Sequence, residues 1–448
     1  MMYGKTFIIL HEANMIKIYN PINKQNIELK SKKISIYNCG PTVYNYVHIG
    51  NVRPLITFDV LYRYLLSLKK DVIYLHNITD IDDKIIKQAQ ELKLSEKQIS
   101  EKYTKAYFEL FKLLNIKKMQ TSKVSQHIKD IILHIKKLIK KGYAYAKDGD
   151  VYFDIRKLKD YGHISNQNLK DLLDGVRKEN LENKNYPLDF TLWKKTSVGL
   201  NWESPWSKGR PGWHTECAVL INKYIGKCAT IHGGGIDLKF PHHENENAQN
   251  EALNNCDIAK IWMHVGHVNI DNEKMAKSLK NYVLVKDIIN KDNANGLRWF
   301  FYKTKYENPI NFNIHLLNEA TDEINKIIHS MSQIETILIG VDQIKKEQCS
   351  LPIDFKKIID DDLNFPNTIT FILNQVKNLN QAIREKQYSK ANGILCALKK
   401  EFDILGLTYN FVHYKNLSLI KNWDRSVREK KYKKADMYRK QLIKKGLL

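Results

Sequence analysis

The 448-residue sequence lacks the features of a membrane protein, a repeat protein and a secreted protein. No run of apolar residues is long enough to span a bilayer. The N-terminal stretch "FIIL" is too short to be the apolar core of a signal peptide. Internal repeats and low-complexity tracts are also absent. We therefore expect a cytoplasmic protein with no membrane partner.

Cysteine is scarce, and its spacing is wide. The six cysteines form no CxxC pair and lie too far apart for a compact disulfide framework; they occupy positions 39, 217, 228, 256, 349 and 396. Because a cytoplasmic setting keeps thiols reduced, a functional cysteine in this chain is expected to be a metal ligand or a nucleophile.

Acidic residues are too few to balance the basic ones. The chain contains 72 Lys and Arg against 49 Asp and Glu, which gives a formal net charge of +23. A basic excess of this size favours a polyanionic partner, with nucleic acid as the first candidate. A lysine-rich composition throughout explains part of the excess. Residues 411–448, however, hold twelve Lys and Arg against three Asp and Glu, a bias that exceeds the chain average. We favour RNA contact at this end over the alternative, a solvated helix face.

Alternating strand and helix patterns predict an α/β fold. Residues 33–40 and 70–80 read as strands, and residues 51–68 and 81–92 carry apolar residues at helical spacing. This order implies parallel strands with helical crossovers, hence a doubly wound sheet. With 43% hydrophobic residues, the chain can build sizeable cores in two to four domains.

The remaining pattern divides the chain further. Ser95 and Gln98 have the spacing of a capping box, which predicts a new helix there. Residues 119–205 are irregular and read as an insertion between two halves of the sheet domain. Residues 314–405 show helical periodicity and predict a bundle. Residues 424–448 are predicted to form one basic amphipathic helix followed by a glycine stop.

Two polar stretches, "NCGPTVYNYVHIGN" and "HNITDIDD", follow directly after the predicted strands. Ligands of doubly wound sheets bind at this edge. Within "HIGN", Gly50 permits close backbone approach, and the helix N-terminus behind it favours anions. His48 can donate to a phosphate oxygen. An ordinary capped turn is the alternative interpretation of this tetrapeptide.

The stretch "DNEKMAKSLKN" places Lys274, Lys277 and Ser278 close together. Two lysines three positions apart can both face a polyphosphate and neutralise charge that grows on a leaving group. The alternative is a solvated, lysine-rich surface loop.

The stretch "FPHHENE" carries a candidate metal site. If Pro241 opens a helix, His242 and Glu246 are i and i+4 on one helical face, where they can share a zinc ion. His243 would then face elsewhere, in a structural or supporting role. A solvent-facing His–Glu pair is the alternative interpretation.

Two cysteines shift the balance towards a metal. Cys217 in "GWHTEC" and Cys39 would complete a set of sulfur, nitrogen and oxygen donors with His242 and Glu246. Donors drawn from three separated segments indicate a site built onto a folded sheet rather than a zinc finger.

Several long blocks together resemble cysteinyl-tRNA synthetases, a family of class I aminoacyl-tRNA synthetases. The blocks are "YNCGPTVYNYVHIGNVRP", "NITDIDDKI", "LWK", "WESPWSKGRPGWHTEC", "IHGGGIDLKFPHHENE" and "KMAKS", in the family's order over about residues 15–320. The resemblance implies an α/β, Rossmann-type parallel-sheet catalytic domain with a connective insertion, then an α-helical bundle and a small basic C-terminal domain. The implied bounds are 15–318 for the catalytic domain (halves about 15–118 and 206–318, insertion about 119–205), 319–408 for the bundle and 409–448 for a shortened anticodon-binding domain.

The resemblance implies ATP-dependent ligation of L-cysteine to tRNA(Cys) through a cysteinyl-adenylate, with release of AMP and diphosphate. One Zn²⁺ per chain would select the cysteine thiolate, and Mg²⁺ would accompany ATP. A metal that binds sulfur is useful here because an apolar pocket separates close isosteres by only about 1–3 kcal/mol, whereas a soft sulfur ligand is favoured over a hydroxyl. We expect the chain to act as a monomer.

The resemblance also assigns site residues. The zinc ligands fall on Cys39, Cys217, His242 and Glu246. The catalytic residues fall on His48, Asn51, Lys274 and Lys277. ATP would contact His48, Asn51, Gly233, Gly234, Gly235, Lys277 and Ser278. The cysteine pocket would include Gly40, Thr79, Trp213, His232 and Asp237.

The chain departs from the family pattern at three points. Asn51 replaces the last histidine of the "HIGH" block, Ala276 replaces the first serine of the "KMSKS" block, and the C-terminal region is short. Two other functions stay open at this stage. A ligase that joins cysteine to an amino sugar shares the fold and zinc site, and a zinc-containing RNA-binding protein could have lost catalysis. The basic helical region after residue 319 argues against the first, and the intact His48, Lys274 and Lys277 against the second.

Overall fold

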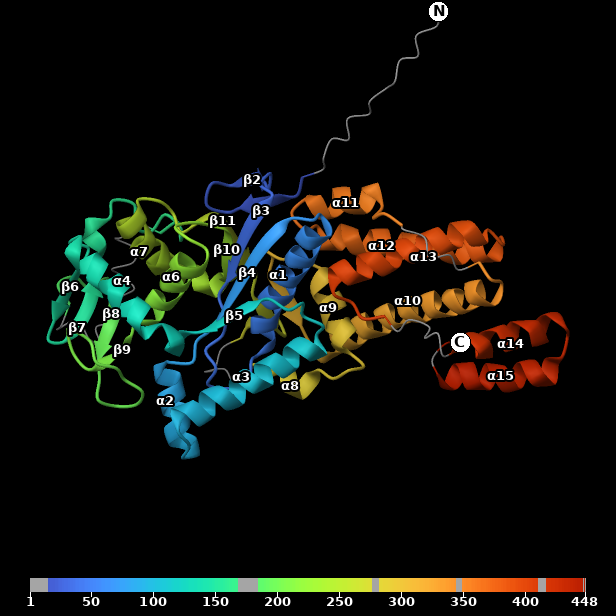
Figure 1. Cartoon of the computed structure of the whole chain (residues 1–448), viewed down its shortest axis with the longest axis horizontal. Coiled ribbons are helices and arrows are strands. Elements are labelled where there is room, and N and C mark those ends of the chain that lie inside the picture. The colour runs from blue at the N-terminus through green and yellow to red at the C-terminus, as the bar shows by residue number, and fades with distance from the viewer. Residues whose placement is uncertain are drawn as a thin grey trace, which may run out of the picture.

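The computed structural model describes residues 15–167, 184–275, 282–343, 349–409, 416–445 and 447. Its central feature is a five-stranded parallel sheet in the order β11-β10-β3-β4-β5 (Figure 1). The strands are β3 (Lys33–Asn38), β4 (Asp71–Ile78), β5 (Gln120–Lys123), β10 (Ala229–Gly235) and β11 (Ala259–Val265). The order reverses between β3 and β10, which confirms the predicted doubly wound, Rossmann-type sheet.

Helices cover both faces of this sheet. Ile34 and Ile36 of β3 pack in one core with α1 (Ile49–Ser67), whereas the adjacent Tyr37 packs in a second core with α6 (Trp213–Tyr224). Successive strand residues point to opposite faces, so this alternation places the two helices on opposite sides. The two predicted strand–helix units are confirmed, and α1 is buried along most of its length.

Two further helices follow β4 and continue the first half. They are α2 (Asp83–Leu92) and α3 (Glu96–Leu113). The N-cap of α3 is Ser95, and both bonds of the predicted capping box with Gln98 are present. Helix α3 runs back towards the turn that precedes α1, because Tyr103 packs edge-to-face against Tyr46.

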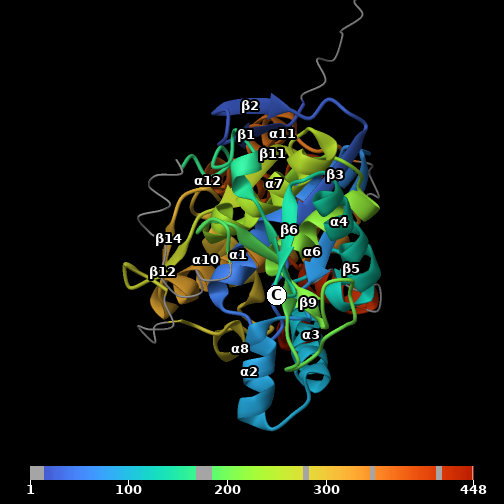
Figure 2. The ribbon, with the colours of Figure 1, turned by 90° about the vertical axis from the view of Figure 1, so that its left-hand side faces the viewer.

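The insertion begins later than predicted. Strand β5 lies within residues 119–205 but pairs in parallel with β4, so the first half of the sheet extends beyond residue 118. After it come α4 (Ile128–Lys140) and a four-stranded antiparallel sheet in the order β6-β7-β8-β9, which lies on the side of the molecule that faces the viewer in Figure 2. Its strands are β6 (Ala144–Lys147), β7 (Asp150–Phe153), β8 (Phe190–Lys195) and β9 (Gly209–Pro211).

The second half of the sheet domain is formed by α6, β10 and β11. Helix α7 (Glu244–Asn254) connects β10 to β11. Small strands surround this core: β1 (Lys17–Asn20) pairs with β2 (Gln25–Glu28), and β12 (Val268–Ile270) pairs with β13 (Glu273–Lys274) and β14 (Ile310–Phe312).

The chain beyond β12 is mostly helical, and the predicted bundle is confirmed. The short α8 (Val285–Ile288) and α9 (Ala294–Tyr302) lead into it. The bundle helices are α10 (Ile314–Gly340), α11 (Ile353–Asp360), α12 (Phe365–Arg384) and α13 (Tyr388–Leu405). In Figure 1 they extend away from the sheet on the side opposite the insertion.

The single C-terminal helix predicted for residues 424–448 is wrong. Two helices, α14 (Leu417–Arg428) and α15 (Tyr432–Lys444), form a hairpin that packs on α10 through Ile420 and Leu442. The break falls at Glu429–Lys431, where Lys430 adopts a left-handed φ of 56°. No glycine or proline marks that turn in the sequence, so the helical periodicity predicted one continuous helix across it. The predicted glycine stop, Gly446, lies outside the described residues.

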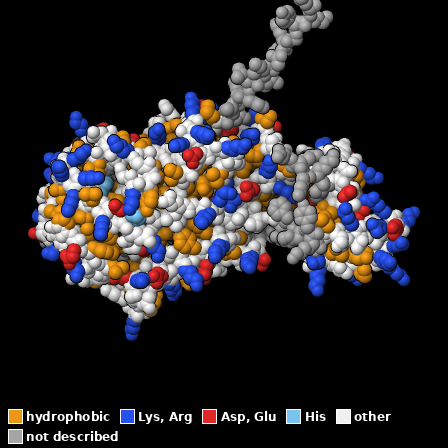
Figure 3. All heavy atoms as spheres, in the orientation of Figure 1, with side chains coloured by type: hydrophobic (Ala, Val, Ile, Leu, Met, Phe, Trp, Pro, Cys, Tyr) orange, Lys and Arg blue, Asp and Glu red, His pale blue; other side chains and the backbone are white. Residues whose placement is uncertain are grey.

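The hairpin surface is strongly basic. Figure 3 shows Lys and Arg side chains on the visible part of this end of the molecule. The exposed cations of the described hairpin are Lys421, Arg425, Arg428, Lys430, Lys431, Lys433, Lys434, Arg439, Lys440, Lys444 and Lys445. Only three carboxylates accompany them: Asp424, Glu429 and Asp436.

Cys349 and Cys396 form a disulfide that joins the segment before α11 to α13. The wide cysteine spacing had argued against a disulfide framework and gave no sign of this single bridge, since its partners are 47 residues apart. In the part of the chain that the structure describes, no helix is both long and apolar enough to cross a membrane.

A buried charge network joins α1 to the bundle, and we call it the Asp59 network. The Asp59 carboxylate of α1 accepts from Arg63 Nε at 2.9 Å and from Arg298 Nη2 at 2.6 Å. Arg298 also donates to the carbonyl oxygens of Leu114 and Leu405, at the C-terminal ends of α3 and α13. All three charged side chains are at least 94% buried, so the network connects α1, α3, α9 and α13 away from water.

Candidate active site

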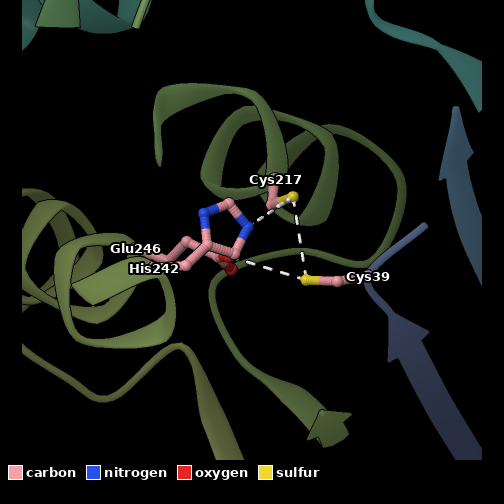
Figure 4. Close-up of side chains that lie close together, drawn as sticks. All are labelled: Cys39, Cys217, His242 and Glu246. Carbon is pink, nitrogen blue, oxygen red and sulfur yellow. Dashed lines mark hydrogen bonds and ion pairs between the residues drawn. The ribbon is translucent and has the colours of Figure 1, made fainter. Parts of the chain in front are cut away.

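Four donor side chains converge at the carboxyl edge of the sheet, where the strand order reverses (Figure 4). Cys39 follows β3, and its N–H donates to the Gly233 carbonyl of β10 at 3.1 Å. Cys217 lies in α6, His242 in the turn that precedes α7, and Glu246 in the first turn of α7. One ligand atom from each residue lies within 4.8 Å of those of the other three. The structure therefore brings together the predicted set.

The spacing of these atoms fits a tetrahedral metal site. The two sulfur atoms are 3.9 Å apart, Cys217 Sγ is 3.6 Å from His242 Nε2, and Cys39 Sγ is 3.6 Å from Glu246 Oε1. With metal–sulfur bonds of about 2.3 Å and metal–nitrogen bonds of about 2.0 Å, tetrahedral angles give sulfur–sulfur and sulfur–nitrogen edges of roughly 3.8 and 3.5 Å. The His242 Nε2–Glu246 Oε1 edge, at 2.7 Å, is shorter than this geometry requires.

Outer hydrogen bonds hold the donors in place. His242 Nδ1 lies 3.1 Å from His214 Nδ1, which leaves Nε2 directed at the cluster. Glu246 Oε2 is held by His232 Nε2 at 2.6 Å, and His232 Nδ1 lies 3.1 Å from the carbonyl oxygen of Tyr37. Such outer partners orient metal ligands and fix the tautomers of histidines.

His243 does not face away as predicted. The segment Lys239–His243 before α7 is not a regular helix, because the backbone of Phe240 is extended, with φ −137° and ψ 137°. His243 Nε2 lies 3.5 Å from Cys39 Sγ, and Nδ1 lies 3.0 Å from His264 Nε2. This gives a second possible donor set with Cys39, His232 and Glu246.

The four donors of the cluster strongly affect one another's pKa values. Burial, with the nearby Cys217, raises the pKa of the Cys39 thiol well above its ordinary value. Burial would also raise the pKa of Cys217, but hydrogen bonds from Cys39 and His242 lower it to about 7. Burial disfavours charge on His242, yet Glu246 and Cys217 outweigh it and raise its pKa to about 10. Two sulfurs and a carboxylate held away from water are the donor types that zinc accepts.

The cluster borders a pocket of about 320 Å³. Cys39, Gly40, Trp213, Gly235 and Asp237 line it near the cluster, and His48 and Asn51 line it further along. The Trp213 ring stacks on that of His242 with centroids 4.2 Å apart. Cys39 and His48, nine positions apart, therefore serve one cavity.

The "HIGN" turn forms the second wall. His48 is the N-cap of α1, and its backbone N–H donates to Asn51 Oδ1 at 3.3 Å. Gly50 lies close to the "KMAKS" block, because a Cβ at this position would lie 2.8 Å from Met275 Cε and 3.0 Å from His48 Nδ1. The chain after this block also returns to the turn: Ile49 N–H donates to the Val283 carbonyl at 3.0 Å. Lys277 and Ser278 lie outside the described residues, and Lys274 is placed by its backbone in β13.

Comparison with known proteins identifies the family. Residues 25–322 match the family described as tRNA synthetases class I (C) catalytic domain, and residues 354–410 match the DALR domain. Cysteine–tRNA ligases from Malacoplasma penetrans (strain HF-2) and Ureaplasma parvum serovar 3 are each 46% identical to this chain over 441 and 439 residues. Each match covers 97% of this chain and 100% of the relative. The chain belongs to the cysteine–tRNA ligases.

Solved structures support the fold of this cysteine–tRNA ligase family member. Mycobacterium tuberculosis methionyl-tRNA synthetase in complex with methionyl-adenylate superposes with a TM-score of 0.60 at 11% identity. The match covers 88% of this chain and 91% of that one. The chain therefore has the class I synthetase architecture, and the resemblance stated from its motifs is confirmed.

The remaining predicted site residues belong to two groups, the cysteine pocket and the ATP glycines. Of the cysteine-pocket residues, Gly40, Trp213 and Asp237 line the pocket. Thr79 and His232 are buried beside it, where Thr79 donates to Glu216 at 2.9 Å and His232 holds Glu246. Of the predicted ATP glycines, Gly235 lines the pocket, while Gly233 and Gly234 are buried within β10.

Sequence reasoning missed several residues that line the pocket, and two of them form a pair. His76 of β4 and Tyr107 of α3 both line the cavity and are hydrogen-bonded to each other. A histidine inside the apolar strand "VIYLHNI" was the only available signal for His76. Tyr107 carried no signal, because an aromatic residue at helical spacing normally indicates core packing.

Proposed function

We propose that this chain ligates L-cysteine to tRNA(Cys) through a cysteinyl-adenylate, using ATP and Mg²⁺, with one zinc ion at the four-donor cluster. The observation that supports this most is the pocket itself, since the cluster with Cys39 borders the same cavity as His48 and Asn51. We propose further that the enzyme works in the cytoplasm as a monomer.

Zinc at this cluster would supply a soft Lewis acid that prefers the thiolate of cysteine to the hydroxyl of serine. Cys39, Cys217, His242 and Glu246 would hold it. His214 and His232 would keep His242 and Glu246 in the ligating orientation. Trp213, stacked on His242, would close the side of the amino-acid site.

In the first step, the carboxylate of cysteine attacks the α-phosphorus of ATP in line, and diphosphate leaves. His48, Lys274 and Lys277 take up the charge that develops on the phosphates, and the N-terminus of α1 adds its dipole. Asn51 is held by the backbone of His48, and its amide remains available for a nucleotide oxygen. In the second step, a ribose hydroxyl of the tRNA 3′-terminal adenosine attacks the adenylate and releases AMP. Positioning and electrostatics carry both steps, without a protein nucleophile.

Amino-acid-dependent ATP–pyrophosphate exchange tests this proposal. Exchange should depend on cysteine, be far weaker with serine, and fall after treatment with a chelator. The acceptor then distinguishes the two ligases. A tRNA ligase transfers cysteine to tRNA, whereas the alternative enzyme transfers it to an amino sugar. The absence of cysteine-dependent exchange in metal-replete protein would reject catalysis.

The α14–α15 hairpin supports contact with tRNA. Lysines at 433, 434 and 440 are exposed on α15, where Asp436 is the single carboxylate. Phosphate contacts by such lysines release counterions, so affinity depends on salt. We propose that this surface tracks the RNA backbone.

The double variant Lys433→Gln/Lys440→Gln should bind tRNA more weakly, with the slope of log Kd against log salt reduced by about 2. Fluorescence anisotropy with labelled tRNA over a range of salt concentrations measures this slope. The control, Lys24→Gln/Lys30→Gln, removes the same charge from exposed positions around β2. Equal slopes in both variants would contradict an RNA contact at the hairpin.

A further inference from the structure

The pocket wall beside Gly40 contains a hydrogen-bonded chain that no motif accounts for. His76 Nδ1 lies 2.9 Å from the carbonyl oxygen of Asn38, and His76 Nε2 lies 3.0 Å from the hydroxyl of Tyr107. Both side chains line the cavity, although only 1% of His76 and 3% of Tyr107 is exposed. This pair is therefore directed at the cavity and not at open solvent.

The partners determine where each hydrogen lies. A backbone carbonyl only accepts, so His76 Nδ1 carries the ring proton. Burial lowers the pKa of His76 to about 4, so the ring is neutral near pH 7 and Nε2 has no proton. Nε2 therefore accepts from the Tyr107 hydroxyl. Because the single hydrogen of this hydroxyl points at His76, the Tyr107 oxygen keeps its lone pairs for another donor.

The position of this oxygen is fixed by packing. The Tyr107 ring lies edge-on to Phe111, with centroids 4.8 Å apart, and is stacked near His76 at 5.9 Å. The pair also abuts the turn after Cys39, because a Cβ on Gly40 would come within 3.2 Å of His76 Nε2. A rigid hydrogen-bond acceptor thus lies next to the residue that follows a metal-cluster cysteine.

We propose that Tyr107 accepts a hydrogen bond from a donor group of a bound substrate, and that His76 is the positioning residue that holds the Tyr107 hydroxyl in its accepting orientation. This rests on the proposed function, which brings two such donors into the pocket. One is the α-ammonium group of the amino acid, and the other is a ribose hydroxyl at the tRNA 3′ end. The ammonium is favoured, since Gly40 adjoins the cluster that would hold the thiol, and charged donors make the stronger bonds.

The variant Tyr107→Phe removes the oxygen and keeps the ring. If the ammonium is the donor, the KM for cysteine in pyrophosphate exchange should rise about 10- to 100-fold, with the KM for ATP unchanged. If the ribose hydroxyl is the donor, exchange stays normal and only transfer to tRNA slows. Tyr103→Phe is the matched control, because Tyr103 lies one helical turn earlier on α3 and does not line this pocket. Normal exchange and normal transfer in Tyr107→Phe would overturn the proposal.

Two variants of His76 test the positioning role. Glutamine can place a carbonyl oxygen near the former Nε2 and still accept from Tyr107, whereas leucine cannot. His76→Leu should therefore reproduce the effect of Tyr107→Phe, and His76→Gln should restore most of the lost affinity. A merely structural histidine would give equal defects in both variants, which would overturn its role. Cysteine-dependent exchange by the unaltered chain is measured first. If it is absent, the proposed function fails, and if it is present, the variants test the roles of Tyr107 and His76.

Discussion

Replacing Cys217 with serine is expected to lower metal affinity and cysteine-dependent pyrophosphate exchange by more than about 100-fold. Cys217 is 99% buried, and its sulfur lies 3.9 Å from Cys39 Sγ and 3.6 Å from His242 Nε2. Serine offers a harder, poorly ionised oxygen on a shorter bond, so a soft cation loses one of its two sulfur ligands. Changes to outer partners of metal ligands already cost 10- to 100-fold, and a direct ligand should cost more. Metal content by mass spectrometry and exchange kinetics are the two measurements.

Two further variants sharpen this experiment. Cys217 belongs to the predicted donor set only, and His243 to the alternative set only. His243→Gln should therefore retain about one metal ion per chain, while Cys217→Ser should not. Cys228→Ser is the neutral control, since Cys228 is a free, half-buried cysteine outside both sets. The reverse pattern, with metal lost from His243→Gln and retained in Cys217→Ser, would assign the site to the other set.

Replacing Asp59 with asparagine is expected to lower the free energy of unfolding by about 3–5 kcal/mol. The carboxylate of Asp59 is fully buried between Arg63 and Arg298, whose guanidinium groups are 2.9 and 2.6 Å away. Asparagine would leave two buried cations without the negative charge between them. Urea-induced unfolding, followed by tryptophan fluorescence, measures the change, because Trp299 is buried on α9 next to Arg298.

The comparison for this variant is Asp403→Asn. The Asp403 carboxylate also contacts Arg63, at 3.2 Å, but its side chain is 72% exposed. An exposed ion pair contributes about 1 kcal/mol or less, so this variant should unfold almost as the parent does. If both variants lower the free energy of unfolding equally, the buried Asp59 network stabilises the fold no more than an exposed ion pair does.

The main elements of the catalytic region were predictable because their local signals agree with the fold. In strand β3, the buried Ile34 and Ile36 alternate with the more exposed Lys33 and Ser35. The capping box at Ser95 marks the start of α3. Family motifs supplied what periodicity could not, namely that Cys39 and Cys217, which lie 178 residues apart, meet in one cluster. No local pattern encodes a contact of that separation.

Other features depend on tertiary packing and left no readable pattern. Strand β5, "QTSK", is short and polar, and it is a strand because the edge of β4 offers it backbone partners. The break at Glu429–Lys431 arises because the hairpin packs Ile420 and Leu442 together on α10. His243 lies beside Cys39 and follows an irregular turn, extended at Phe240, which helical spacing does not anticipate.

The four donors come from three separate stretches of the chain, so metal binding would affect the stability of the fold. Cys39 comes from the first half of the sheet domain, and Cys217, His242 and Glu246 come from the second half, beyond the antiparallel insertion. A cation held by all four would bind only when both halves have assembled, so it would stabilise the assembled state. The free energy of unfolding would then rise by about 1.4 kcal/mol for each tenfold increase in free metal above the dissociation constant. Metal starvation should thus deplete intact protein as well as its catalytic output.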